Sequence, residues 1–177
     1  NDMVINYAKQ YSDMPFVIML DEDENGYKAG RFLRASDLGM SGENNEWKPV
    51  IQDKLSQQLL VPNGTMGQRW EEGKKWNLKL ETEDGTPIDP MLSMVESDYH
   101  VETIQFPYFD SSGDGIFERP IATRTIQLAN GEEVKIATVY DLMTSQYGVQ
   151  RFEHELEATS YDDASSKYTP AWQEQIT

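Results

Sequence analysis

Histidine has the widest chemical use of any side chain, and this 177-residue sequence contains two, His100 and His154. Imidazole can transfer protons or bind metal ions near neutral pH. No G-x-S-x-G motif occurs in the sequence, so we do not expect hydrolysis by a serine triad. Glu153, Glu155 and Glu157 surround His154, but a di-metal carboxylate site needs such ligands repeated on a facing helix. We interpret these residues as an exposed, charged helix face.

A second chemical pattern runs from Asp110 to Gly115 and matches the opening of a calcium loop. Oxygen-bearing side chains stand at positions one, three and five, and glycine stands at six. The twelfth position requires a bidentate glutamate and is Ile121, with Glu118 as the only nearby replacement. We therefore predict a solvated turn rather than a calcium site. The acidic run from Asp21 to Glu24 is interpreted in the same way, as a solubilising loop tip.

The glycine-bearing stretch from Pro62 to Trp70 offers backbone N–H groups and Arg69 to an anion. It lacks the lysine and hydroxyl residue of a P-loop, so a packed irregular turn is the preferred interpretation. The adjacent Asp162 and Asp163 point apart in most backbone conformations and are expected to cap or turn the chain. The sequence therefore assigns no catalytic and no metal-binding residue, and it leaves the cofactor-binding residues open.

Charge excludes two classes of partner. The 31 acidic and 15 basic residues give a net charge of −16, which repels nucleic acids and anionic membranes. The longest apolar run extends from Phe16 to Leu20, whereas a spanning helix needs about 20 residues, so direct membrane insertion is not expected. The sequence has no cysteine, which excludes disulfides and thiolate ligands from these residues.

Secondary-structure elements must position these residues. The sequence pattern predicts a single α+β segment over residues 1–177, with short, mostly antiparallel strands, hairpins and a few short helices. Val4, Tyr7, Ala8 and Tyr11 recur at helical spacing and predict an opening amphipathic helix. The other expected elements are a buried strand at 16–20 returning as a hairpin at 27–33, a loop at 39–46, short strands at 47–51, 58–61, 76–80 and 101–106, a turn at 83–87 and a helical stretch at 149–156.

The segment from Ile126 to Ile136 carries the clearest hairpin signal, centred on Asn130 and Gly131. A two-residue loop would mix polar and apolar side chains on each face. A three-residue loop at 129–131, with Gly131 in the left-handed conformation as a bulge, pairs Ile126 with Val134 and keeps the faces distinct. We predict this bulged hairpin.

Two further helices are expected towards the end of the sequence. Thr138 caps the first, which presents Val139, Leu142, Met143 and Tyr147 on one side, carries Asp141 near its positive end and stops at Gly148.

The second begins at Pro170 with Thr169 as its cap, and it needs a partner for Trp172 and Ile176 because so short a helix is marginal alone. The sequence stops at Thr177 after two turns of this helix, and it also begins inside a helix. We therefore expect a piece of a longer polypeptide.

A set of sequence strings carries a family resemblance that covers nearly the whole chain and is weakest at 91–104 and 149–158. The strings occur in the order MPFVIML, GYKAGRFLRASDL, NNEWKPV, VPNGTMGQRW, GKKWNL, FPYF, TVYDL, TSYDD and YTPAWQEQIT. The chain thereby resembles an internal segment of the catalytic alpha subunits of membrane-bound respiratory nitrate reductases, in the molybdopterin-containing DMSO reductase family.

The resemblance implies a share in reducing nitrate to nitrite at a molybdenum held by two molybdopterin guanine dinucleotides. It implies as partners the rest of the alpha subunit, an iron–sulfur beta subunit and a haem gamma subunit, on the cytoplasmic side of the bacterial membrane. The family's ligands to the molybdenum and to the 4Fe-4S cluster have no counterpart here, so no cofactor is expected on this segment and none of its residues is expected to be catalytic. Arg69 and Arg124 could attract an anion, although surface salt bridges are their preferred role. The competing interpretation is a stand-alone acidic binding module, with its dependence on calcium left open.

Overall fold

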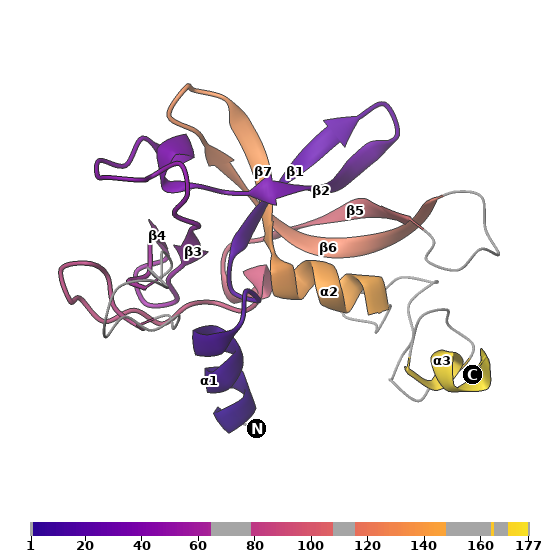
Figure 1. Cartoon of the computed structure of the whole chain (residues 1–177). Helices are drawn as coiled ribbons and strands as arrows, with labels where there is room; N and C mark the ends of the chain where they lie inside the picture. The colour runs from indigo at the N-terminus through magenta and orange to yellow at the C-terminus, as the bar shows by residue number, and fades with distance from the viewer. Residues whose placement is uncertain (1, 65–78, 108–115, 148–163, 165–169, 177) are drawn as a thin grey trace.

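The computed structural model describes residues 2–64, 79–107, 116–147, 164 and 170–176 (Figure 1). Its helices are α1 (Asp2–Tyr11), α2 (Val139–Tyr147) and α3 (Pro170–Ile176), with the 3-10 turns η1 (Ala35–Leu38) and η2 (Met94–Glu96). Its strands are β1 (Val17–Asp23), β2 (Gly26–Phe32), β3 (Ile51–Gln52), β4 (Leu59–Leu60), β5 (His100–Pro107), β6 (Ile116–Gln127) and β7 (Glu133–Thr138). The predicted α+β class is confirmed.

A small closed barrel organises the fold, in the strand order β1-β2-β5-β6-β7. Its pairings are antiparallel except between β2 and β5, where Tyr27 lies beside Ile104 in a parallel pair. The prediction of mostly antiparallel strands is therefore confirmed. Closure of the barrel was not predicted, because it depends on the contact of β1 with β7, which are more than a hundred residues apart in sequence.

Side chains on the two faces of the barrel strands enter different apolar clusters, as the alternation of a strand requires. One cluster gathers buried residues of the strands with others from the 33–61 region and η2: Val17, Met19, Leu33, Val50, Met94, Ala122 and Ile136. The other gathers Leu20, Ile104, Phe106, Ile121 and Ala137, with Leu142 of α2 and Trp172 of α3 packed against them. Trp172 thus packs against the barrel, as the short helix α3 was expected to require.

The predicted strand at 16–20 is confirmed as β1, whose first four residues are buried. The loop tip predicted at 21–24 is wrong in extent, because Asp21, Glu22 and Asp23 continue β1 and pair with β2. The turn contains only Glu24 and Asn25. The short turn is possible because Gly26 adopts a φ of 122°, which glycine reaches without steric cost.

A β-bulge bends the β1–β2 hairpin at its middle. Ile18 lies opposite Phe32 and Leu20 lies opposite Ala29, so β2 contributes one extra residue around Gly30. A Cβ at Gly30 would stand 2.7 Å from the carbonyl oxygen of Met19, which explains the glycine. Beyond the bulge β2 stays paired with β5 at Tyr27 and Lys28, whereas β1 separates from β7, with which it pairs only from Val17 to Met19.

The predicted hairpin at 126–136 is confirmed in its register and loop. Ile126 pairs with Val134, and Leu128 N–H donates to Glu132 O at 2.8 Å across the loop at 129–131. Gly131 has a φ of 85°, whereas Asn130 is not among the residues with positive φ. This is the type I turn with a glycine bulge that separates apolar from polar side chains.

Sequence reasoning missed most of β6, the longest described strand, because polar residues and Pro120 interrupt its apolar pattern. Pro120 lies opposite Thr103 of β5 near the middle of the strand, ahead of residues 124–127 that pair with β7, so its missing N–H removes no bond of the β6–β7 ladder. The strand predicted at 47–51 is wrong except at Ile51, where β3 begins, and the one predicted at 58–61 is shortened to β4, whereas β5 and the loop at 39–46 are as predicted.

The predicted cap of α2 is confirmed. Asp141 N–H donates to Thr138 Oγ1 at 3.0 Å. The Asp141 carboxylate is fully buried and accepts from Ser93 Oγ at 2.6 Å and from Met94 N–H at 2.7 Å. The carboxylate therefore joins α2 to η2. It stabilises the N-terminus of each, since a carboxylate is favourable at a helix N-terminus.

Helix α1 forms as predicted, but its apolar face does not pack within the described chain. Val4, Tyr7 and Tyr11 are 63%, 64% and 50% exposed, and Ala8 alone of the four predicted face residues is buried. A different residue secures the helix, because Lys9 Nζ forms an ion pair with Asp89 at 2.5 Å. Figure 1 shows α1 projecting from the barrel.

Candidate functional site

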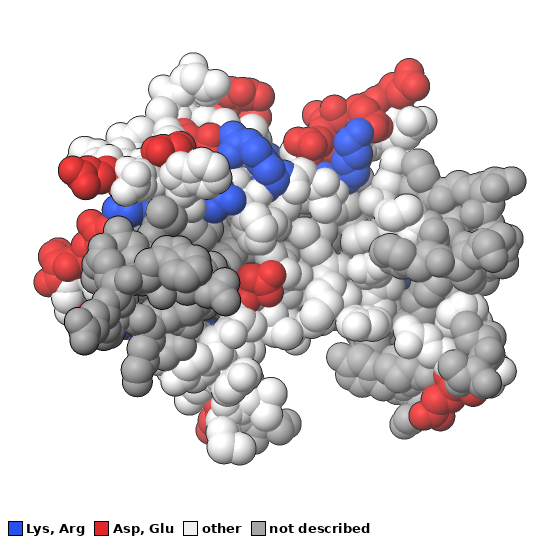
Figure 2. Space-filling model, viewed as in Figure 1, with Lys and Arg blue, Asp and Glu red and all other residues white. Residues whose placement is uncertain are grey.

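The β1–β2 hairpin and the β6–β7 hairpin diverge from each other in Figure 1, and a cleft lies between them. We call it the hairpin cleft, and its volume is about 850 Å³. Its lining comes from both hairpins and from η1: Met19, Leu20, Asp21, Glu22, Tyr27, Arg31, Asp37, Thr125, Leu128, Asn130, Glu132, Glu133, Val134 and Lys135. Figure 2 shows acidic side chains on both sides of the cleft and basic side chains between them.

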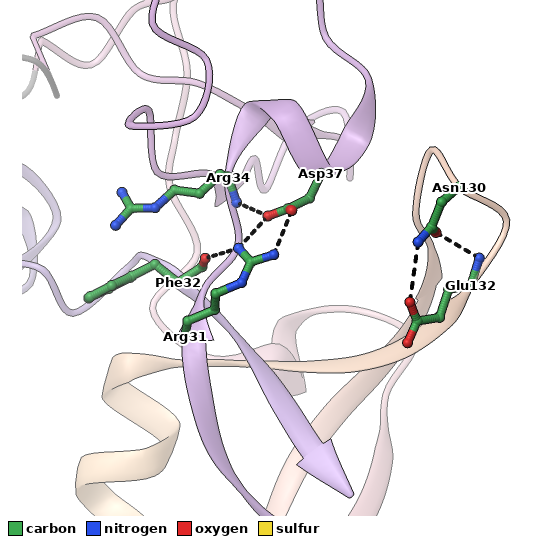
Figure 3. Close-up of polar contacts among 6 residues, drawn as sticks. All are labelled: Arg31, Phe32, Arg34, Asp37, Asn130 and Glu132. Carbon is green, nitrogen blue, oxygen red and sulfur yellow. Dashed lines mark hydrogen bonds and ion pairs between the residues drawn. The ribbon is translucent and has the colours of Figure 1, made fainter.

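Asp37 organises the end of the cleft nearest η1 (Figure 3). Its carboxylate accepts two hydrogen bonds from the Arg31 guanidinium, each at 2.7 Å, and one from Arg34 N–H at 2.8 Å. The bonds from Arg31 hold the pKa of Asp37 below its usual value, although burial acts in the opposite direction. The carboxylate is therefore ionised at neutral pH and fixes β2 to η1.

The main chain of Asp37 reaches the opposite hairpin. Its carbonyl oxygen accepts from Ala129 N–H at 2.8 Å, in the loop between β6 and β7. Asp37 thus contacts both hairpins, through its side chain on one side and its backbone on the other. This arrangement sets the separation of the two walls at this end of the cleft.

Lys135 occupies the wall that belongs to β7. Its ammonium group contacts Glu102 of β5 and lies 4.7 Å from the centre of the Tyr27 ring. Burial works to lower the pKa of Lys135, but its bonds to Glu102 and Tyr27 outweigh burial and raise it. The lysine is therefore charged at neutral pH and is already engaged on the barrel.

The cleft carries an excess of negative charge. Its two cations, Arg31 and Lys135, are paired with Asp37 and with Glu102. Its remaining carboxylates come from both hairpins and are Asp21, Glu22, Glu132 and Glu133. In the loop, Glu132 N–H donates to Asn130 Oδ1 at 3.0 Å, and Asn130 Nδ2 donates to the Glu132 carboxylate at 3.3 Å (Figure 3).

A smaller pocket of about 450 Å³ brings together two residues that the sequence singled out separately, His100 and Arg124. Arg124 Nη1 donates to Gln57 O at 3.1 Å, so Arg124 engages a carbonyl rather than the salt bridge that we expected. Glu96 and Asp98 line the same pocket, and Glu96 forms an ion pair with Lys54 at 2.6 Å. The acidic lining opposes the attraction of an anion to Arg124.

The second half of the calcium-loop pattern lies in a strand. Ile121 is buried in β6 opposite Glu102, and Glu118 lies opposite Gln105. A strand holds these residues in an extended line instead of curving them around an ion. Among the residues that the structure describes, no three His, Asp or Glu side chains group as metal ligands.

Several segments and residues named in the sequence analysis fall outside the described residues. They are Asp110–Gly115, most of 62–70 with Arg69, the strand expected at 76–80 except its last two residues, Gly148, the helical stretch at 149–156 with His154 and its glutamates, Asp162–Asp163, and the cap Thr169. Residues 79 and 80 are not in a strand. The corresponding predictions stand as they were made.

The hairpin cleft was not foreseen from the sequence. A weak signal existed, because acidic pairs stand beside the turns of two predicted hairpins, at 21–23 and 132–133. Their proximity depends on the barrel, which brings β1 beside β7. The cleft offers carboxylates, strand backbone and paired cations, with neither histidine, serine nor cysteine in its lining. Carboxylates and strand backbone can bind a cationic or extended ligand.

Comparison with known proteins identifies the relatives of this chain, although no protein-family model matches it. The chain is 44% identical to the nitrate reductase alpha chain of Bacillus subtilis over 174 residues, which cover 98% of this chain and 14% of that protein. The chain is homologous to a segment of nitrate reductase alpha chains. It is also 39% identical to the respiratory nitrate reductase 1 alpha chain of Escherichia coli, over 97% of this chain and 15% of that protein. A nitrate reductase alpha subunit of Mycobacterium tuberculosis is 36% identical over 98% of this chain.

These nitrate reductase relatives confirm the resemblance found in the sequence. The chain spans 14% to 15% of the length of the Bacillus and Escherichia proteins, so it corresponds to a small part of each. In the part of the chain that the structure describes, no helix combines the length and the apolar character needed to cross a membrane.

Proposed function

We propose that these residues form a structural segment of a nitrate reductase alpha chain and pack against other parts of that polypeptide. The similarity over nearly the whole chain supports the parent enzyme. The observation that carries the structural role is the apolar face of α1, where Met3, Val4 and Tyr7 are 82%, 63% and 64% exposed. Exposed apolar patches of this kind mark contact surfaces in soluble proteins.

The parent enzyme would reduce nitrate to nitrite at molybdenum bound by two molybdopterin guanine dinucleotides, with electrons supplied through a 4Fe-4S cluster. The donor set of this segment does not fit the ligation of a 4Fe-4S cluster. It has no cysteine to bind a cluster, and its described acidic and histidine side chains do not converge on a common point. Its contribution is therefore architectural, as a wall or support for parts of the enzyme that hold cofactors.

The same proposal extends to partners and location. The segment would join the rest of the alpha chain in a complex with iron–sulfur and haem subunits on the cytoplasmic side of the bacterial membrane. Relatives whose names contain "respiratory nitrate reductase" support a role in respiration. The net charge of −16 keeps nucleic acids and anionic lipid away from the segment itself.

Elemental analysis and a nitrate reduction assay with reduced viologen test the inactivity of the isolated segment. We expect no stoichiometric molybdenum or iron in the purified 177-residue chain and no nitrite formation. The whole alpha chain in its complex is the positive control. Stoichiometric molybdenum or turnover by the isolated chain would show that the proposal is wrong.

Substitution of the α1 face tests the packing role. In the isolated chain, Val4→Ser with Tyr7→Ser should change the free energy of unfolding by less than about 0.5 kcal/mol, because both side chains are exposed. In the whole alpha chain the same pair should lower the yield of assembled enzyme. Asn6→Ser, on the same helix and also exposed, is the matched control. Equal yields for both variants would contradict the role of this face.

A further inference from the structure

The hairpin cleft lies between two strands that stop pairing part-way along their length. The register of β1 with β7 runs through Ile18↔Ala137 to Met19↔Ile136 and ends there in the described structure. Both strands continue beyond this point, β1 as far as Asp23 and β7 back to Glu133. The bulge around Gly30 carries the β1–β2 hairpin away from β7. Two strand edges therefore face each other across the cleft.

The direction of the backbone groups on β1 follows from the antiparallel alternation. Phe16 O accepts from Val139 N–H on the β7 side, whereas Val17 O accepts from Leu33 N–H on the other side. Main-chain groups of even-numbered residues on β1 therefore point towards β7. The last pair of the ladder, Met19↔Ile136, uses Leu20 N–H and Lys135 C=O, so Leu20 C=O and both main-chain groups of Glu22 face the cleft.

The same reasoning applies to β7. Leu128 N–H bonds with Glu132 O, and Ile126 pairs with Val134, so even-numbered residues of β7 direct their main-chain groups towards β6. Both main-chain groups of Glu133 and the N–H of Lys135 consequently face the cleft. Exposed strand edges of this kind are templates for pairing with a further strand.

Charge indicates what kind of strand fits between these edges. Asp21, Glu22 and Glu133 are exposed, and the two cations of the cleft are already paired with Asp37 and with Glu102. A strand that carries lysine or arginine would complement these carboxylates, whereas an acidic strand would be repelled. The floor of the cleft includes Leu20, which is 6% exposed, so alternate apolar side chains can also be accommodated.

We propose that the hairpin cleft binds an extended, basic segment from another part of the same alpha chain by β-strand addition between β1 and β7. The inserted strand is antiparallel to one edge and parallel to the other, because β1 and β7 are themselves antiparallel. The occupant belongs to the same polypeptide because the relatives extend far beyond the residues matched here, with about 85% of their length outside this segment. The inference therefore rests on the proposed function.

A peptide titration of the 177-residue chain tests the binding chemistry. The probe is a short peptide of alternating lysine and valine, and its controls are the glutamate and valine analogue and a lysine peptide with a central proline. We expect the first peptide to slow hydrogen exchange at the amides of Glu22, Glu133 and Lys135 by about tenfold at saturation. Equal protection by the acidic or proline peptide would overturn the proposal.

Two variants at one position separate backbone pairing from charge. Glu133→Pro removes an N–H that faces the cleft at the first residue of β7, a position where proline is tolerated. It should weaken binding of the lysine peptide about tenfold, whereas Glu133→Gln keeps the N–H and should weaken it only about threefold. If Glu133→Pro fails to fold, Glu22→Pro removes the corresponding donor on β1. Unchanged binding by a folded proline variant would overturn the proposal.

Photo-crosslinking in the whole alpha chain tests the source of the occupant. A crosslinking amino acid at Glu22 should join a peptide from elsewhere in the same chain, and a second probe at Tyr7 reports on the α1 face. A crosslink at Tyr7 without one at Glu22 would overturn the cleft proposal and leave the structural role intact. A crosslink from Glu22 to a different subunit would also overturn it. The absence of both crosslinks would contradict the structural role as well.

Discussion

Replacing Asp37 with alanine removes one side chain from the contact between the β1–β2 hairpin and the β6–β7 hairpin. The Asp37 carboxylate accepts two bonds from the Arg31 guanidinium and one from Arg34 N–H, and all three are lost in Asp37→Ala. The bond from Ala129 N–H to the Asp37 carbonyl belongs to the backbone and should persist. The variant therefore removes the link from η1 to β2 and retains the link to the β6–β7 loop.

The expected loss of stability follows from the exposure of the partners. The Asp37 side chain is 15% exposed and the Arg31 side chain is 58% exposed. An ion pair with so exposed an arginine contributes about 0.5–1 kcal/mol. The bond to Arg34 N–H resembles a helix cap and contributes about 1 kcal/mol. We expect Asp37→Ala to lower the free energy of unfolding by about 1.5–2 kcal/mol, as the sum of these two contributions.

The pH dependence of this loss has a definite sign. Bonds from Arg31 hold the pKa of Asp37 below its ordinary value in the folded chain. A carboxyl group with a lowered folded-state pKa stabilises the protein fully above its unfolded pKa of about 4. That contribution disappears as the pH falls through the lower, folded value. The difference between wild type and Asp37→Ala should therefore be greatest at neutral pH and shrink below about pH 4.

Urea denaturation at neutral pH and at about pH 3 measures both effects. Arg31→Met is the matched control, because it removes the ion pair and retains the bond from Arg34 N–H to Asp37. It should cost about 0.5–1 kcal/mol, roughly half the loss in Asp37→Ala. The reasoning is refuted if Arg31→Met costs as much as Asp37→Ala, or if the Asp37→Ala difference stays constant through the acid range.

Three further substitutions test other parts of the fold by the same denaturation assay. Gly30→Ala should cost about 1–3 kcal/mol, because its Cβ would stand 2.7 Å from a backbone oxygen that cannot retreat freely; a neutral result would contradict the bulge geometry. Gly131→Ala should cost about 1 kcal/mol from its φ of 85° alone, since no atom lies within 4 Å of the added Cβ, and Gly131→Asn should cost less. Asp141→Asn should lower the free energy of unfolding by about 2–4 kcal/mol, because one oxygen of a buried carboxylate that accepts three hydrogen bonds becomes an NH2 donor. A loss below about 1 kcal/mol would contradict this account.

Local patterns in the sequence were sufficient for several elements. The buried strand β1, the α2 cap at Thr138 and the bulged loop at Gly131 each depend on residues within a few positions of one another. Steric preference, capping and side-chain alternation act over that range, so their outcome is visible in the sequence. The acidic residues at 21–23 were misjudged because charge favours a loop, whereas the pairing of β1 with β2 keeps them in a strand.

Tertiary structure alone decided the rest. Closure of the barrel depends on the pairing of β1 with β7, and β6 is held between β5 and β7 despite its irregular pattern. The hairpin cleft and the double contact of Asp37 follow from that closure, because the residues concerned are about a hundred positions apart in sequence. The apolar periodicity of α1 was plain in the sequence, but its exposure was not. A pattern specifies which face is apolar, and only the arrangement of the other elements determines whether anything covers it.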